Sequence, residues 1–110
     1  MPNRTLAFSL LLPLIAALGG CASSMIDVRP GSDKVAAATP AQVGQCRHLG
    51  KTTVSVLSKV GFVDRSIEAV DANLLQLARN SAVDMGGDTV VPGERPAVGR
   101  RVFDVYKCRP

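Results

Sequence analysis

The sequence predicts a small α+β domain in which one helix packs on a three-stranded sheet, closed by a disulfide and preceded by a flexible segment. Three observations predict this architecture. Residues 65–85 carry apolar side chains at helical spacing. The segments on either side of them contain runs of threonine and valine, which suit strands. Finally, Cys46 and Cys108 bracket this region, and a core of this size usually needs a covalent link.

The expected order of elements is β-α-β-β. The first strand covers residues 51–59, where Val54 and Val56 lie on one face. After the helix come a short strand at residues 89–91 and a longer one at residues 101–108. Three strands of this kind provide one sheet face for a single helix to cover.

The predicted helix has the clearest pattern in the chain. Asp64 or Ser66 is suited to cap its N-terminus, and Gly86 with Gly87 to end it. Asp71 lies at the edge of the apolar stripe, where we interpret it as a partly solvated residue rather than a buried active carboxylate. The stripe expected to form the core contains Ile67, Val70, Leu74, Leu77, Ala78, Ala82 and Met85, and the opposite arc contains Glu68, Gln76, Arg79 and Asn80.

The first twenty residues have the pattern of an export signal. Arg4 gives a positive start, and residues 6–18 follow as the uncharged run LAFSLLLPLIAAL. A membrane-spanning helix needs roughly 20 apolar residues, and Pro13 would disturb one here. We therefore predict a signal peptide at residues 1–20 rather than a membrane span.

The sequence LGGC at residues 18–21 resembles the lipobox of bacterial lipoproteins. This resemblance implies cleavage before Cys21, lipidation of its thiol and anchoring in a lipid bilayer by two or more acyl chains. Because position 22 is alanine rather than aspartate, it also implies the outer membrane, with the domain facing the periplasm. The competing interpretation is an ordinary secretory signal with a spare thiol. Lipidation is favoured because it leaves Cys46 and Cys108 to pair in an oxidising compartment.

The segment after the lipobox is rich in Ala, Ser, Pro and Gly and has no sustained apolar period. We expect residues 21–45 to form a flexible lipidated tether with a reach of roughly 27 Å. The folded domain would then occupy residues 46–110.

The run NSAVDMGGDTVV at residues 80–91, together with Tyr106 and Cys108, resembles the family called domain of unknown function 4156. The resemblance covers most of residues 46–108 and implies a fold rather than an activity. The chain is also distantly similar to the outer-membrane lipoproteins that sense envelope damage for the Rcs phosphorelay. It departs from them in having Gly87 where they have alanine, and two cysteines besides the lipidated one.

Composition and motifs argue against several functional classes. The charge is +4 and the basic residues are scattered, with no tryptophan and Tyr106 as the only tyrosine, so no nucleic-acid binding is expected. Cys46, His48 and Cys108 could together offer three metal ligands, but their spacing does not match a zinc motif, and an exported chain with two such cysteines more often forms a disulfide. A hydrolase would need His48, yet no G-x-S-x-G elbow occurs. We predict no catalytic residues, no metal, no cofactor and no small-molecule substrate.

Arg100 and Arg101 are the only adjacent basic pair. They are candidates for contact with anionic lipid headgroups or an acidic partner, although basic residues on a terminal strand also serve to prevent edge-to-edge aggregation. The predicted function is a non-catalytic interaction or stress-sensing module that binds an envelope protein. The alternative is a structural lipoprotein that supports the outer membrane or peptidoglycan.

Overall fold

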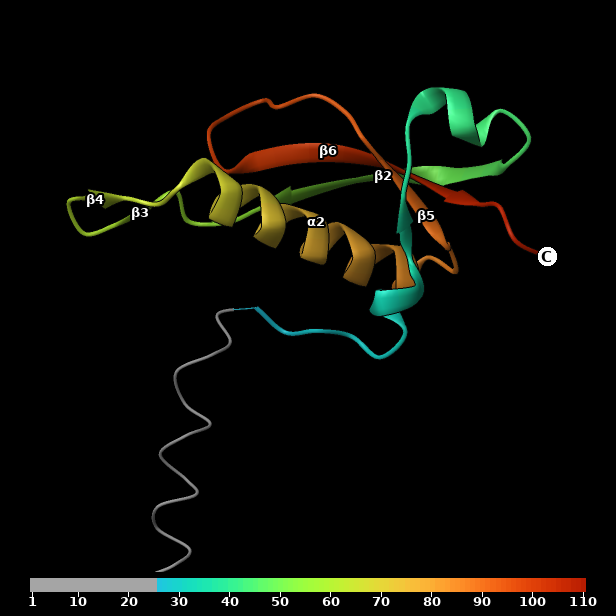
Figure 1. Cartoon of the computed structure of the whole chain (residues 1–110), viewed down its shortest axis with the longest axis horizontal. Coiled ribbons are helices and arrows are strands. Elements are labelled where there is room, and N and C mark those ends of the chain that lie inside the picture. The colour runs from blue at the N-terminus through green and yellow to red at the C-terminus, as the bar shows by residue number, and fades with distance from the viewer. Residues whose placement is uncertain (1–25) are drawn as a thin grey trace, which may run out of the picture.

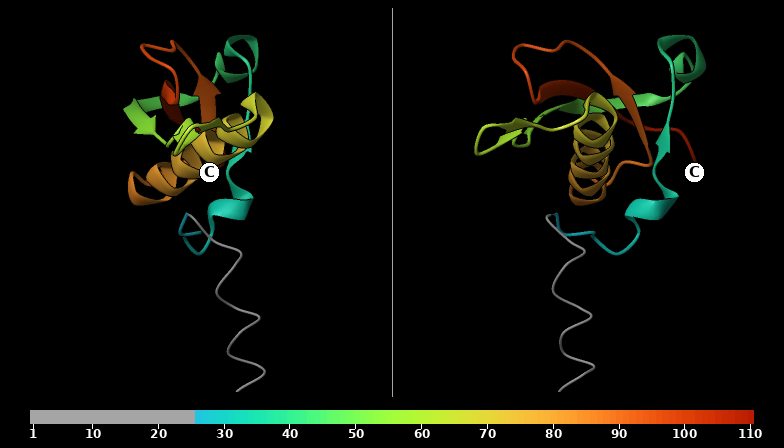
Figure 2. Two further views of the ribbon diagram at one scale, coloured as in Figure 1. Left: turned by 90° about the vertical axis from the view of Figure 1, so that its left-hand side faces the viewer. Right: turned by 60° about the vertical axis from the view of Figure 1, so that its left-hand side comes forward.

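The computed structural model describes residues 26–110, so the predicted signal peptide and Cys21 lie outside the described residues. Helix α2 crosses one face of a curved sheet, and a small hairpin extends beyond the sheet at the end opposite the C-terminus (Figures 1 and 2). The elements in chain order are η2 (Ser32–Lys34), β1 (Ala36–Ala37), η3 (Pro40–Val43), β2 (Arg47–Ser55), β3 (Lys59–Val60), β4 (Val63–Asp64), α2 (Ile67–Asp84), β5 (Thr89–Pro92) and β6 (Arg100–Lys107).

The sheet has four strands in the order β1-β5-β6-β2, which corrects the prediction of three. The β2–β6 and β5–β6 pairs are antiparallel, as expected of neighbours in a small α+β sheet. The additional strand, β1, pairs in parallel with β5 at the edge. It is held by backbone hydrogen bonds from Ala36 N to Asp88 O and from Ala38 N to Val90 O, both 2.9 Å. Because these bonds involve only the backbone, no side-chain pattern indicated the strand.

The prediction of a flexible tether is wrong over residues 26–45, which belong to the domain. Ser32, Val35 and Val43 are all buried there. Val35 is part of the core cluster, and the Ser32 hydroxyl accepts a hydrogen bond of 3.1 Å from the side chain of Gln76 on α2. A segment rich in small residues has therefore gained its order from contacts with the helix and the sheet edge rather than from its own periodicity.

The helix prediction is confirmed, with small changes at the ends. Ser66 is the N-cap, and its hydroxyl accepts a hydrogen bond from the Ala69 N–H at 3.2 Å. Gly86 follows the helix in the left-handed conformation, with φ 77°. At Gly87 a Cβ atom would lie 2.5 Å from Val105 Cγ1, so close packing on β6 requires glycine.

The core lies between α2 and the sheet, where Ala78 and Ala82 are fully buried and permit close approach. Two residues of the predicted stripe are exposed instead: Ile67 in the first helical turn, and Met85 just past the last. The first strand also lies earlier in the chain than predicted, because β2 covers Arg47–Ser55 rather than residues 51–59. The core cluster consists of Val35, Val54, Val70, Leu74, Ala78, Ala82, Val90, Phe103 and Val105.

Asn80 was expected on the exposed arc of the helix, but it is buried and links the helix to the start of the domain. Its side-chain oxygen accepts hydrogen bonds from Arg29 N at 3.0 Å and from Gln76 Nε2 at 2.9 Å. Its side-chain nitrogen donates to Asp27 O at 2.6 Å. The Asn80 side chain thus provides hydrogen-bond partners for the backbone of residues 27–29, which are not part of a strand.

Asn80→Ala is expected to lower the free energy of unfolding by about 1–3 kcal/mol, because two backbone groups lose their partner. Hydrogen exchange should accelerate chiefly at the amides of residues 27–35. Asn73→Ala, a substitution of the same kind two turns earlier on α2, is the control. Equal exchange rates in the two variants would contradict this assignment of Asn80.

Candidate functional site

The large apolar side chains that remain exposed gather at one end of the domain. Of eight such residues in the described part of the chain, six lie on or beside the β3–β4 hairpin, and Phe62 at its tip is fully exposed. The remaining two, Val28 and Met85, lie elsewhere. Monomeric proteins rarely expose apolar side chains in such a concentration unless the surface binds something. We call this surface the apolar end, and it consists of Leu57, Val60, Phe62, Val63, Ile67 and Val98.

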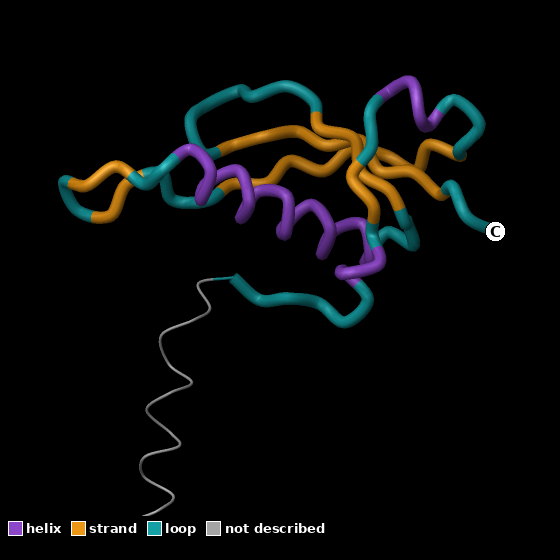
Figure 3. Tube along the Cα trace, viewed as in Figure 1, coloured by secondary structure: helices purple, strands orange, loops and turns teal. Residues whose placement is uncertain are grey.

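Backbone geometry fixes the hairpin that carries the apolar end (Figure 3). Val60 pairs with Val63 across a turn in which Gly61 has φ 63°. At the base, Arg65 donates from its backbone N to Ser58 O at 2.8 Å and from Nη1 to Leu57 O at 2.9 Å. The exposed side chains are therefore presented by an ordered projection and not by a loose loop.

A cavity of about 730 Å³ adjoins the hairpin, between the start of α2 and the loop before β6. Val98 and Ile67 line it, together with an ion pair in which Nη1 and Nη2 of Arg95 donate to the two carboxylate oxygens of Asp71, at 2.7 and 3.0 Å. The hydrogen bond from Arg95 lowers the pKa of Asp71, which stays ionised. Asp71 is thus a partly exposed, charge-paired residue on the helix flank, as the sequence indicated.

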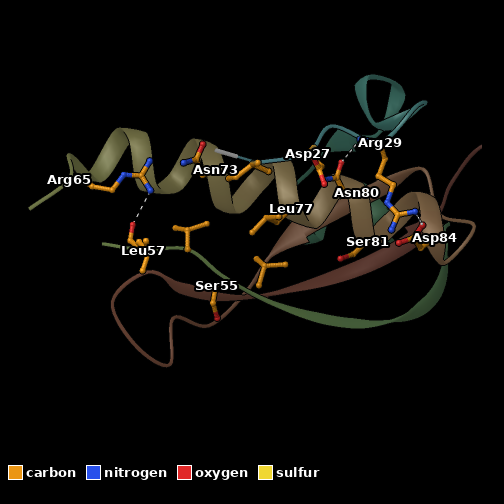
Figure 4. Close-up of a pocket in the computed structure, with 13 residues that line it drawn as sticks. Asp27, Arg29, Ser55, Leu57, Arg65, Asn73, Leu77, Asn80, Ser81 and Asp84 are labelled. Atoms are coloured by element: carbon orange, nitrogen blue, oxygen red, sulfur yellow. Dashed lines mark hydrogen bonds and ion pairs between the residues drawn. The ribbon is translucent and has the colours of Figure 1, made fainter. Parts of the chain in front are cut away.

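A second cavity, of about 560 Å³, lies between α2 and the end of β2 (Figure 4). Its apolar wall includes Leu57 and Leu77, and its polar wall includes the ion pair between Arg29 and Asp84, with Nη1 2.9 Å from Oδ1. Ile26, the first described residue, lines the same cavity as Leu57. The start of the described chain therefore lies along the side of α2 on which this cavity runs, from Leu57 near the hairpin to Asp84 at the other end of the helix.

The two arginines singled out from the sequence do not form one surface. They are successive residues of β6, so their side chains leave opposite faces of the sheet. Arg100 Nε donates to the Ser55 hydroxyl at 3.2 Å, while Arg101 Nε donates to Gly93 O at 3.1 Å and lies over the Phe103 ring. Burial lowers the pKa of Arg101. Only Arg100 is an exposed residue.

Cys46 and Cys108 form the expected disulfide, which joins the residue before β2 to the residue after β6. His48 lies on the sheet, where its Nε2 is 2.8 Å from Asp104 Oδ1 and its ring contacts Tyr106 edge to face. Within residues 26–110, no group of three or more His, Cys, Asp or Glu side chains could hold a metal ion. No helix in that range has the length and apolarity to cross a membrane.

Sequence reasoning missed the apolar end. The signal that could have found it is Val60-Gly61-Phe62-Val63, three large apolar residues around a turn glycine, just ahead of the helix. A turn normally carries polar side chains, so an apolar one is informative.

These features define a small disulfide-closed α+β domain, with one helix on a four-stranded sheet and an exposed apolar end. The family model described as a domain of unknown function, DUF4156, matches residues 26–108. The chain belongs to this family. No curated protein and no solved structure matches it. The match begins at residue 26, in agreement with the ordered structure of residues 26–45.

Proposed function

We propose that this protein is a lipid-anchored envelope lipoprotein of the outer membrane whose periplasmic domain is a non-catalytic interaction module. The exposed apolar end carries the proposal, because it is an ordered surface suited to bind something. The polar groups beside it, such as Arg95 and Asp71, are engaged with each other in an ion pair. That arrangement supports binding rather than chemistry.

Anchoring through Cys21 would hold this domain close to the bilayer. The chain between Cys21 and Ile26 spans at most about 18 Å when fully extended. The longer tether expected from the sequence is reduced to these few residues, because residues 26–45 are part of the domain. The module would therefore act at the membrane surface itself.

Replacing Cys21 with serine is expected to release the protein from the membrane. Produced behind an ordinary cleavable secretory signal in place of residues 1–20, the mature Cys21→Ser protein should incorporate no radiolabelled palmitate and appear in the soluble periplasmic fraction, since no acyl chains remain to partition into lipid. Ser23→Ala, two residues on, is the matched control and should behave as the parent. The proposal fails if the parent takes up no palmitate, or if Cys21→Ser still sediments with the envelope.

A further inference from the structure

We propose that the apolar end is a membrane-insertion tip, in which Phe62 and its hairpin neighbours enter the boundary between lipid headgroups and acyl chains. This inference rests on the proposed function, since it takes the anchor in Cys21 to hold the domain at a bilayer. It goes further by naming what the apolar end binds, namely the lipid of that same bilayer.

The shape of the hairpin favours lipid over a protein partner. β3 and β4 are two residues each, and they project past the sheet as a narrow arm (Figures 1 and 3). A stable protein interface buries about 800 Å² on each partner, which requires a broad surface. A narrow apolar projection instead suits insertion into a fluid layer, which closes around it. Phe62 can enter without any movement of α2 or the sheet, because its side chain already lies fully in solvent.

The charges around the tip are balanced, which makes apolar burial the driving force. Lys59 and Asp64 face each other at the base of the hairpin, with Nζ 3.8 Å from Oδ1. Arg65 and Glu68 follow, so residues 59–68 contain two basic and two acidic side chains. Such a segment has little attraction for anionic headgroups. Its charged residues lie at the level of the headgroups when the tip enters, where they stay hydrated.

The position of the anchor points to the same surface. Ile26 and Leu57 line one cavity along α2, so the end of the described chain nearest Cys21 lies on the same side of the helix as the residue that leads into the hairpin. Because residues 21 and 26 are at most about 18 Å apart, acylated Cys21 brings the hairpin within reach of the bilayer. Anchor and tip then form two membrane contacts of one domain, and the second occurs at high effective concentration.

The test uses a tryptophan as a depth probe, since the chain has none of its own. The lipidated mature F62W variant is reconstituted in zwitterionic vesicles that contain lipids brominated near the headgroup end of the acyl chain. We expect a blue-shifted emission that is quenched by at least about half. Q45W is the matched control: Gln45 is exposed beside the disulfide, away from the hairpin, and its emission should stay red-shifted and unquenched.

A protein that floats with the vesicles but shows an unquenched F62W emission would overturn the insertion proposal while leaving the anchor intact. A parent that does not float with the vesicles would instead contradict the proposed function. Crosslinking from a photoreactive residue at position 62 to an envelope protein, or to a second copy of the chain, without any crosslink to lipid in cells, would also overturn insertion.

A second measurement separates apolar insertion from charge attraction. The unlipidated Cys21→Ser protein should bind zwitterionic vesicles weakly, and Phe62→Ser should weaken that binding at least about tenfold. Binding should change less than about twofold between 0.05 and 0.5 M salt, and Arg100→Glu should leave it unchanged. Loss of binding in high salt or in Arg100→Glu, with Phe62→Ser behaving as the parent, would assign the contact to the basic residues and overturn the proposal.

Discussion

Replacing both Cys46 and Cys108 with serine is expected to lower the free energy of unfolding by about 4 kcal/mol. The bridge closes a loop with a sequence separation of 62, and loss of that closure releases chain entropy in the unfolded state. A domain of this size has a total stability of only about 5–10 kcal/mol. Urea unfolding followed by the helical circular dichroism of α2 would measure the change.

The single substitution Cys21→Ser is the matched control, because it removes a cysteine outside the bridge and should leave the urea midpoint unchanged. Treating the parent with a reductant should reproduce the double variant. A double variant that unfolds at the same urea concentration as the parent would show that the bridge contributes nothing to stability.

Asp88 is expected to make the domain sensitive to acid. Its side chain is 9% exposed, and burial by itself would raise the pKa of the carboxyl group. Hydrogen bonds from Cys108 N and Arg109 N, both 2.8 Å, and from the Thr89 hydroxyl at 3.0 Å outweigh burial. With Lys107 nearby, they lower the pKa of Asp88 from 3.8 to about 2.

Because the pKa of Asp88 is lower in the folded state than in the unfolded state, the unfolded state binds more protons between pH 4 and pH 2. The stabilisation is therefore complete above about pH 4 and is lost as the pH falls towards 2, by about 2 kcal/mol. Asp88→Asn should be less stable than the parent at pH 7 and should lose less stability on acidification. Denaturant unfolding at pH 7, 4 and 2 would measure both effects.

Asp64→Asn, at an exposed carboxylate, is the control for this experiment and should keep the acid sensitivity of the parent. If Asp88→Asn and the parent lose stability in parallel between pH 4 and pH 2, the titrating group is not Asp88.

The helix could be predicted from sequence because its signals are local. Ser66 begins it, the glycines end it, and a regular stripe such as Val70, Leu74 and Ala78 faces the sheet. Asn80 could not be placed in the same way, since its burial depends on residues 27–29 folding back onto the helix. The predicted burial of Ile67 is wrong for a related reason. The apolar stripe continues into the first helical turn, but no other part of residues 26–110 packs over Ile67 there.

Strand β1 was beyond prediction from sequence, because two exposed alanines carry no periodicity and only the backbone of β5 defines them. The disulfide, by contrast, could be predicted from cysteine parity once the lipobox resemblance had assigned Cys21 to lipidation. Only part of the candidate site could be predicted from the sequence. Arg100 and Arg101 are adjacent in sequence, but strand alternation places their side chains on opposite faces of the sheet. Phe62 lies between the predicted strand and the predicted helix, where no regular pattern indicates which way its side chain faces.

The parallel pairing of β1 with β5 has a mechanical consequence for a chain held by its N-terminal end. A pull from that end runs along β1 and loads its backbone hydrogen bonds to β5, including those to Asp88 and Val90, in shear. If they yield, unravelling can proceed only as far as Cys46, because the sulfur bridge ties that residue to the last strand. Residues 26–45 would then extend under load, while the part of the domain closed by the disulfide, residues 46–108, stays folded.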